Sequence, residues 1–417
     1  MKLYTRLFTL LLCLGQVLSA QTPASEQDKR IILHGATVHI GNGKLMENAV
    51  IIIEEGKIKD IADAKRVRLD TTNSVYIKAQ GKHIYPGFIL PNSTLGLVEI
   101  DAVRATRDAR ETGFMNPHVR SIIAYNTESI VSSTVRTNGI LLSQICPRGG
   151  RISGTSSIVE MDGWNWEDAV FKEDDGLQLN WPYYRTSKKK QYSEQITAMK
   201  DFFAKAKAYS EATAKETDLR MEAMKGIFNG SKTLFIHAWQ QIELQDAVYF
   251  SKEYGVKKIV LTGAGEAWKI ADFLAAKNIP VILERTHSLP SHEDEAVDMP
   301  FKKAYLLQKA GVLYCLNYAG DMERMGSRNL PFTAGTTAAY GVNKEDALSS
   351  ITLNAAQILG IDARVGSIEI GKDATLFIST GDALDMRTLQ VEHAFIRGKQ
   401  LDLNNHQKEL YEKYKKR

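Results

Sequence analysis

Imidazole and carboxylate groups are concentrated in one short segment, residues 284–295, whose sequence is Glu-Arg-Thr-His-Ser-Leu-Pro-Ser-His-Glu-Asp-Glu. The side chains of His287, His292, Glu293 and Asp294 are of the types that bind divalent cations. The alternative is a polar, solvated lid without a metal, because loops that follow parallel strands often cover a substrate. His287 and His292 are therefore candidate substrate-binding residues on a candidate metal-binding loop.

Two arginines stand among glycines in residues 147–154. Arg148 and Arg151 could hold a carboxylate, because guanidinium groups bind carboxylates through paired hydrogen bonds and glycine-rich turns present backbone N–H groups. The alternative is a tight turn with exposed arginines. We predict that both arginines bind the substrate.

Further along the chain, His237 ends the apolar run of residues 233–236. Its imidazole has two interpretations. It could anchor a metal or act as an acid or base, or it could belong to a polar network.

These candidates follow short apolar segments that alternate with helical segments between residues 86 and 360. Residues 139–145, 233–237, 258–261, 280–283 and 312–316 are strand-like, whereas residues 243–254, 268–276 and 301–310 have helical spacing. Such alternation is typical of a parallel sheet, and the length of the region suits a (β/α)8 barrel. Residues 30–85 and 365–403 have β character instead, so we expect a small additional sheet.

The first residues have the features of a signal peptide. Lys2 and Arg6 precede an apolar run of residues 7–18 that is too short to span a bilayer comfortably, and Ser19 and Ala20 offer a cleavage site. We therefore predict a secreted, periplasmic protein, with residues 1–20 removed and no membrane span afterwards. The formal charge of +4 over 417 residues favours no nucleic-acid partner. Cys146 and Cys315 fall in separate predicted strands, so we expect buried thiols rather than a disulfide.

Three segments carry a resemblance to a known family. Residues 86–97, Pro-Gly-Phe-Ile-Leu-Pro-Asn-Ser-Thr-Leu-Gly-Leu, resemble the first barrel strand of the amidohydrolase superfamily, and residues 366–373 and 352–360 resemble its returning strand and the helix before it. Within the superfamily the chain looks most like secreted bacterial amidohydrolases related to imidazolonepropionase. The resemblance implies a TIM-like barrel at residues 86–360, a composite β-sandwich from residues 30–85 and 361–403, and a helical tail at residues 404–417.

The resemblance also implies where a metal site would lie. The superfamily binds one or two divalent ions through His-x-His on strand 1, histidines on strands 5 and 6 and an aspartate on strand 8. His237 matches the histidine of strand 5, whereas Asn92, Thr94 and Gly263 stand at the positions of lost ligands. Asp321 lies two or three residues beyond the aspartate position and is a second candidate catalytic residue. Arg328, in a segment similar to a family signature, could face the pocket or form a structural salt bridge.

Two functions follow from the resemblance. The first is a hydrolase that acts on C–N bonds of non-peptide or dipeptide-like molecules, with no cofactor or a single Zn²⁺ at a non-standard site. The second is a catalytically inactive homologue, a pseudoenzyme that binds a ligand or partners an intact amidohydrolase. A small-molecule ligand and a homodimer or heterodimer are the expected partners.

Overall fold

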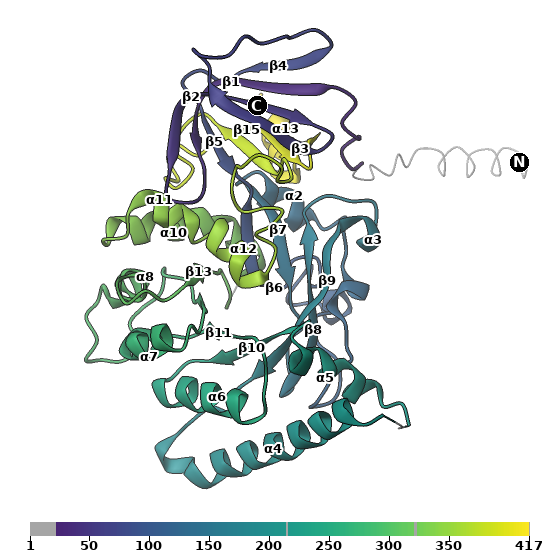
Figure 1. Cartoon of the computed structure of the whole chain (residues 1–417), viewed down its shortest axis with the longest axis vertical. Helices are drawn as coiled ribbons and strands as arrows, with labels where there is room; N and C mark the ends of the chain where they lie inside the picture. Colours follow the sequence, from purple (N-terminus) through teal and green to yellow (C-terminus); the bar gives the residue numbers. More distant parts are fainter. Residues whose placement is uncertain (1–21, 214–215, 321–322, 417) are drawn as a thin grey trace, which may run out of the picture.

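The computed structural model describes residues 22–213, 216–320 and 323–416. The predicted signal peptide and Asp321 lie outside these residues. Two eight-stranded sheets organise the described chain: the first lies at one end of the molecule, and the second carries most of the helices (Figure 1). The first sheet is therefore larger than the small additional sheet expected from the sequence.

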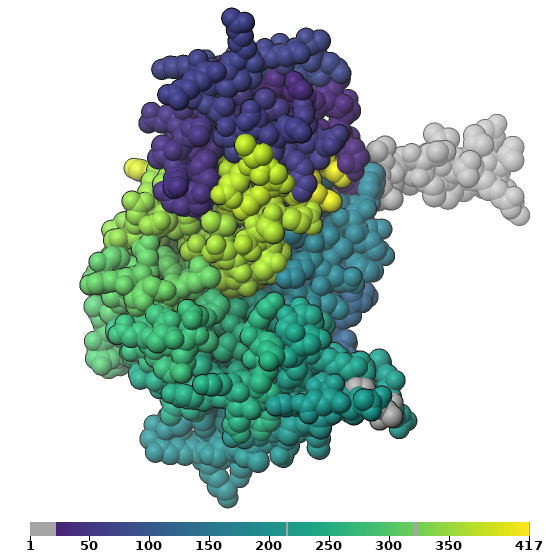
Figure 2. All heavy atoms as spheres, in the orientation of Figure 1, coloured from purple at the N-terminus to yellow at the C-terminus, as the bar shows by residue number. Residues whose placement is uncertain are grey.

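Strands from both ends of the chain share the first sheet. Its order is β16-β15-β14-β5-β1-β2-β3, and β4 pairs with β1. The link between the two chain ends is the antiparallel pair of β5 and β14, in which Ile84 lies opposite Ile378. In Figure 2 the yellow-green atoms near the C-terminus lie against the purple N-terminal ones. The strands are β1 (Arg30–His39), β2 (Leu45–Glu54), β3 (Lys57–Asp63), β4 (Ser74–Lys78), β5 (His83–Pro86), β14 (Leu376–Ser379), β15 (Val391–Ile396) and β16 (Lys399–Gln400).

The second sheet has eight strands in sequence order, and its interior is the main hydrophobic core. The two end strands are joined through the chain before α12 (Leu353–Leu359). Ile89 N donates to Ile351 O at 2.9 Å, and Leu316 N donates to Ser350 O at 3.1 Å. The strands are β6 (Phe88–Ser93), β7 (Ile140–Ile145), β8 (Ile152–Glu160), β9 (Val170–Asn180), β10 (Thr233–Ala238), β11 (Ile259–Gly263), β12 (Val281–Leu283) and β13 (Tyr314–Leu316).

The strand–helix alternation expected from the sequence does not extend to β8. This strand pairs antiparallel with both β7 and β9, whereas the other neighbours in the sheet are parallel. The reason is the short connection: residues 146–151 join β7 to β8, and a parallel crossover needs a dozen or more residues. The fold is therefore a mixed α/β fold with a curled, mostly parallel sheet.

Helices cover the outside of this sheet. The longest, α4 (Lys189–Glu211), lies at the end of the molecule away from the first sheet (Figure 1). No helix of the described chain is long and apolar enough to cross a membrane. Cys146 and Cys315 are buried free thiols, as expected. The other α-helices of the described chain are α2 (Ile130–Arg136), α3 (Trp166–Ala169), α5 (Leu219–Asn229), α6 (Gln241–Glu253), α7 (Ala271–Ala276), α8 (Met299–Lys309), α9 (Glu323–Gly326), α10 (Leu330–Ala339), α11 (Lys344–Ser349) and α13 (His406–Tyr414).

Candidate functional site

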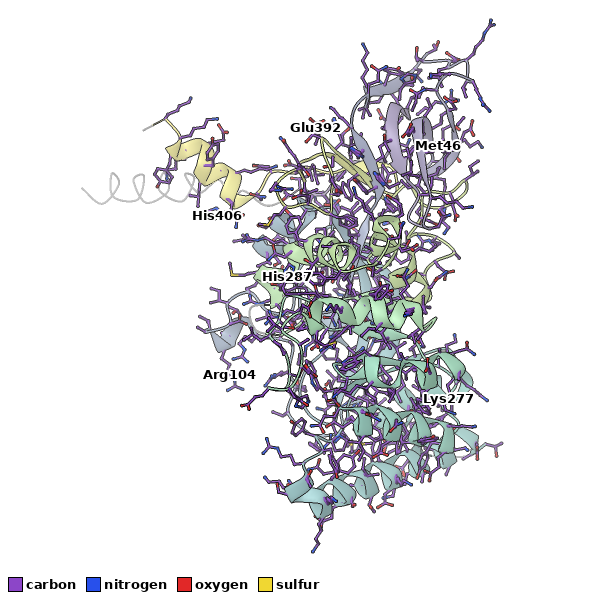
Figure 3. The ribbon with its side chains drawn as sticks, turned by 90° about the vertical axis from the view of Figure 1, so that its left-hand side faces the viewer. Met46, Arg104, Lys277, His287, Glu392 and His406 are labelled. Atoms are coloured by element: carbon purple, nitrogen blue, oxygen red, sulfur yellow. The ribbon has the colours of Figure 1, made fainter. Side chains whose placement is uncertain are left out.

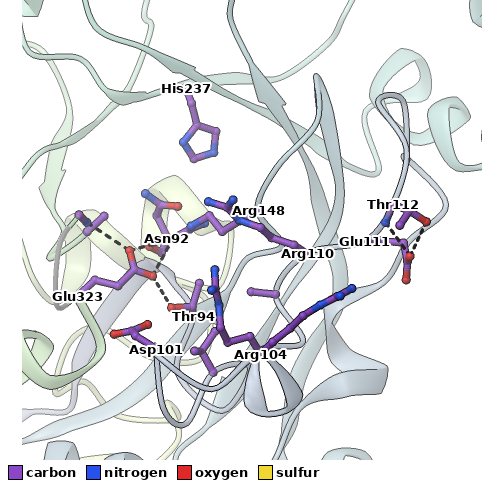
Figure 4. A pocket seen from close by; sticks show the side chains of 15 residues that line it. Asn92, Thr94, Asp101, Arg104, Arg110, Glu111, Thr112, Arg148, His237 and Glu323 are labelled. Carbon is purple, nitrogen blue, oxygen red and sulfur yellow. Dashed lines mark hydrogen bonds and ion pairs between the residues drawn. The ribbon is translucent and has the colours of Figure 1, made fainter.

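One pocket lies at the carboxyl ends of β6 and β10, where the chain also leaves β13. Its volume is about 970 Å³, which suits a small molecule. Ligand sites of barrel folds lie at this end of the strands. The pocket (Figure 4) is lined by Asn92, Thr94, Val98, Asp101, Arg104, Arg107, Ala109, Arg110, Glu111, Thr112, Arg148, His237, Ala319, Gly320 and Glu323.

Arg148 connects the first and last parts of the second sheet across this pocket. Its Nη2 donates to the backbone oxygen of Asn92 at 2.9 Å and lies 3.3 Å from Oε1 of Glu323. Glu323, the first residue of α9, also accepts a hydrogen bond from the Thr94 hydroxyl. The position of Arg148 follows from the strands, because Cys146 N, just after β7, donates to Ser93 O at the end of β6. A positive charge therefore stands beside the end of β6.

Two buried polar atoms of this group have no partner within the described chain. They are Oδ1 of Asn92 and Nη1 of Arg148. Asn92 is 4% exposed and has a φ of +51°, a left-handed conformation that asparagine tolerates better than most residues. An unpaired buried donor or acceptor costs about 1–3 kcal/mol. A ligand that presents an acceptor to Arg148 and a donor to Asn92 would offset this cost.

His237, on β10, faces Asn92 and Arg148 across the pocket (Figure 4). Its Nε2 lies 2.8 Å from Oε1 of Gln178, so we assign the proton to Nε2 and the lone pair to Nδ1. Burial and, secondly, the charge of Arg148 lower the pKa of His237 to about 3. The imidazole is therefore neutral at pH 7 and can accept a hydrogen bond, but it is a weak base.

A chain of buried hydrogen bonds joins His237 to Asn92 through the interior of the curled sheet. Gln178 donates to Ser156, Ser156 and Gln144 both donate to Asp175, and Gln144 accepts from the backbone N–H of Asn92, at distances of 2.9, 2.7, 2.8 and 3.1 Å. Burial raises the pKa of Asp175 above its usual value. This network fixes the two opposite walls of the pocket relative to each other.

The outer part of the pocket carries more positive than negative charge. Arg104, Arg107 and Arg110 line it together with Asp101 and Glu111. Asp101 forms an ion pair with Arg324, which does not line the pocket. Among the described residues that line the pocket, four arginines, Arg148 included, face three carboxylates, the third being that of Glu323. The carboxylate of Asp101 is engaged outside the pocket. The arrangement favours an anionic ligand.

Of the residues predicted to bind substrate, Arg148 lines the pocket and Arg151 does not. Arg151 is 8% exposed and donates to Asn180 O at 2.6 Å and to Gln195 Oε1 at 2.7 Å, so its guanidinium group holds two segments together. Arg328 is exposed and outside the pocket lining. Asp321, which we predicted to be a catalytic residue, lies outside the described residues.

The two histidines of the loop after β12 also lie outside the pocket lining. His287 Nε2 contacts Thr336 Oγ1 at 2.6 Å, whereas His292 Nε2 contacts Glu266 Oε1 at 2.9 Å, so the histidines have different surroundings. The loop does contribute to a cluster of possible metal ligands, which consists of Glu266, His292 and Glu295 rather than the predicted set. Because Lys269 forms a 2.7 Å ion pair with Glu266, a cation already neutralises part of this cluster.

The positions at which the superfamily has metal-binding histidines carry side chains of other types in this chain. Asn92 and Thr94 line the pocket with neutral side chains, and Gly263, at the end of β11, has no side chain to contribute. The sequence interpretation missed Glu323 altogether. Its signal was weak: it lies two residues beyond Asp321, in a segment where we expected a shifted carboxylate. Arg104, Arg107 and Arg110 were also missed, because exposed arginines in a loop have no distinctive spacing.

Comparison with known proteins bears on this arrangement. Residues 309–401 match the model of the Amidohydrolase family. No curated protein matches the sequence. The crystal structure of an amidohydrolase from Thermotoga maritima MSB8 is 25% identical, with a TM-score of 0.77, over 89% of this chain and 99% of that one.

More distant structures share the fold. A prolidase complexed with N-methylphosphonate-L-proline is 15% identical, with a TM-score of 0.55, over 89% of this chain and 99% of that one. An adenosine deaminase from Xanthomonas campestris with bound zinc is 14% identical, with a TM-score of 0.51, over 89% and 92% of the two chains. The family model and the Thermotoga structure support the amidohydrolase superfamily, whereas the more distant structures support the fold.

Proposed function

We propose that this chain is an amidohydrolase-superfamily protein that binds a small anionic molecule without the metal ion of its relatives. The observation that carries the proposal is the position of Arg148, whose guanidinium group contacts both Asn92 and Glu323. A fixed cation thus stands among the residues that would have to bind a metal.

The donor set at this place does not fit a divalent ion. Asn92 and Thr94 supply neutral oxygens, Gly263 supplies none, and His237 is a single imidazole. Glu323 supplies a carboxylate close by, but this carboxylate is already engaged by Arg148 and Thr94. Catalytic zinc sites use three protein ligands that are imidazoles, carboxylates or thiolates, so we propose that the metal-dependent chemistry has been lost.

The ligand class follows from the groups that lack partners. Arg148 Nη1 needs an acceptor and Asn92 Oδ1 needs a donor, while His237 Nδ1 can accept a further hydrogen bond. A carboxylate that carries an N–H nearby, as in an N-acyl amino acid, satisfies these requirements, and the arginines at the rim favour its approach.

One observation favours a second candidate function, metal-independent hydrolysis of a C–N bond. Thr94 donates its hydroxyl hydrogen to Glu323, so this carboxylate could take the proton as the hydroxyl oxygen attacks a carbonyl carbon. Arg148 would then stabilise the oxyanion. The proton would pass from Glu323 to the leaving amine, and water would release the acid from Thr94.

Isothermal titration calorimetry tests both candidates with N-acetyl-L-alanine and, as the uncharged control, N-acetyl-L-alaninamide. We expect the carboxylate to bind with the same Kd to protein treated with EDTA and to protein supplied with Zn²⁺, and the amide to bind much more weakly. Binding or hydrolysis that requires Zn²⁺ would contradict the proposal. Release of L-alanine that persists in EDTA and is lost in Thr94→Val would identify the metal-independent hydrolase.

We also propose, from the sequence motifs, a relation to imidazolonepropionase-like proteins and a periplasmic location. A homodimer, or a heterodimer with an intact amidohydrolase, is the proposed assembly. Co-purification from periplasmic extract followed by mass spectrometry tests the location and the partner together.

A further inference from the structure

A second cavity lies at the opposite end of the barrel strands, where β10, β11, β12 and β13 begin. It is a groove of about 760 Å³ lined by Thr233, Ile259, Pro280 and Leu313, among others, at the starts of these strands. Figure 3 shows its residue Lys277 and the pocket residue Arg104 on opposite sides of the molecule. The groove is therefore separate from the pocket described above.

The groove has a positive charge that its lining does not neutralise. It contains Lys172, Lys252, Lys257, Lys258 and Lys277, and none of the described residues that line it is an aspartate or a glutamate. The whole chain, in contrast, has 53 basic and 49 acidic residues, so the groove departs from the overall balance. Such a local excess attracts anions.

Two of the five lysines have partners in the protein. Lys172 donates to the backbone oxygens of Leu359 and Gly360, at 2.9 and 3.2 Å, and Lys277 stacks over the rings of Tyr249 and Phe273.

The other three, Lys252, Lys257 and Lys258, are exposed, and their ammonium groups form no ion pair within the described chain. The nearest acidic residue in sequence, Glu253, pairs instead with Lys200 of α4 at 2.9 Å. Three cations are thus left to bind an external anion.

The same groove also exposes apolar surface. Leu313 is 37% exposed, and Val256, Ile259 and Ile279 are partly exposed beside it. Burying apolar side chains against a hydrocarbon chain stabilises a complex, because apolar surface is removed from water. A ligand that fits both features has an anionic head group and an apolar body, and the volume of the groove lies within the range of small-molecule sites.

We propose that this groove binds a free amphiphilic anion, a carboxylate with a medium-length hydrocarbon chain. The carboxylate lies against Lys252, Lys257 and Lys258, and the chain lies along Leu313 and Ile279. This inference goes beyond the proposed function and does not depend on it, because no residue is shared by the two linings.

The test uses decanoate below its micelle concentration, measured by displacement of the fluorescent anion 8-anilinonaphthalene-1-sulfonate and by calorimetry. The triple variant Lys252→Gln/Lys257→Gln/Lys258→Gln should weaken decanoate binding by roughly tenfold or more, because the charge-assisted contacts are lost. The matched control Lys188→Gln/Lys189→Gln/Lys190→Gln removes three exposed charges elsewhere and should change the Kd less than about twofold. Thermal unfolding checks that each variant is folded.

A second variant tests the apolar half of the groove. Leu313→Asn should weaken decanoate by roughly fivefold, because it removes apolar contact area. Inorganic phosphate should bind far more weakly than decanoate to the native chain.

Three results would overturn the proposal: equal loss of binding in both triple variants, phosphate binding as tight as decanoate binding, or failure of decanoate to bind while phosphatidylglycerol vesicles do. The last result would assign the lysines to a membrane surface instead.

Discussion

The guanidinium group of Arg148 lies 3.3 Å from the carboxylate of Glu323, although 175 positions separate them in the chain. The two side chains are 21% and 15% exposed, so the contact is largely shielded from solvent. It joins the loop after β7 to the start of α9. Removing one member of such a pair leaves the other charge unpaired in the pocket.

Replacing Arg148 by methionine should therefore affect binding and stability together. We expect Arg148→Met to weaken N-acetyl-L-alanine binding by roughly tenfold or more and to lower the free energy of unfolding by about 1–3 kcal/mol. The double variant Arg148→Met/Glu323→Gln should regain stability but not binding. Arg328→Met, on the exposed surface, is the control. Calorimetry measures the binding, and native-like binding by Arg148→Met would exclude the anion site.

A substitution at Asn92 can change the charge of the pocket with little change in the shape of the side chain. Asn92→Asp keeps the size of the side chain and tolerates its φ of +51°, but it adds a negative charge beside Arg148. We expect binding of the carboxylate to fall by roughly tenfold, because Arg148 is then neutralised within the protein. Added Zn²⁺ should not restore binding. Calorimetry with and without Zn²⁺ measures both effects, and tighter carboxylate binding would contradict this role of the charge.

The low pKa of His237 predicts a pH dependence of stability. Its folded-state pKa of about 3 lies below the ordinary 6.5, so the unfolded chain binds the proton more readily. The neutral imidazole stabilises the folded state fully above pH 6.5, and this contribution is lost as the pH falls towards 3. At pH 5 the loss amounts to about 2 kcal/mol.

Urea denaturation between pH 4.5 and 7.5 measures this effect. Since glutamine does not titrate, His237→Gln should lose less stability than the native chain over this range. The control is His406→Gln, whose side chain is 56% exposed. An identical pH dependence in the native chain and His237→Gln would show that His237 titrates normally.

The buried hydrogen-bond network between His237 and Asn92 should contribute to the stability of the folded chain. Asp175→Ala removes the acceptor of Ser156 and Gln144, and we expect it to lower the free energy of unfolding by about 2–4 kcal/mol. The neighbouring Asp174→Asn keeps a left-handed residue and alters only partly exposed ion pairs, so its cost should stay below about 1 kcal/mol. Chemical denaturation compares the two variants, and equal costs would mean that the network adds nothing.

The superfamily could be predicted from the sequence because its signals are local. The motif before Asn92 and the Gly-Ser-Ile-Glu-Ile-Gly-Lys-Asp segment are continuous in the chain, and alternation of apolar runs with helical spacing revealed most parallel strands. The pair β8 and β9 was missed, since its many serines, threonines and charged residues do not form an apolar run.

The site was harder to predict, because its contacts are distant in sequence. Arg148 was identified from its glycine-rich surroundings, but its partner Glu323 depends on how the chain folds after β13. Arg151, only three residues from Arg148, has a similar local pattern and donates inward to Asn180 and Gln195 instead. Spacing alone does not separate these two arginines, because the turn between them determines which one reaches the pocket.

The pairing of β5 with β14 has a consequence for how the protein is made. Pro86 and Leu376 are neighbours in this sheet, yet the whole second sheet is synthesised between them. Until β14 (Leu376–Ser379) has emerged, one edge of β5 has no partner, and unpaired strand edges promote association with other chains. Native assembly is therefore a late, whole-chain event, and a polypeptide that stops before β14 leaves that edge open.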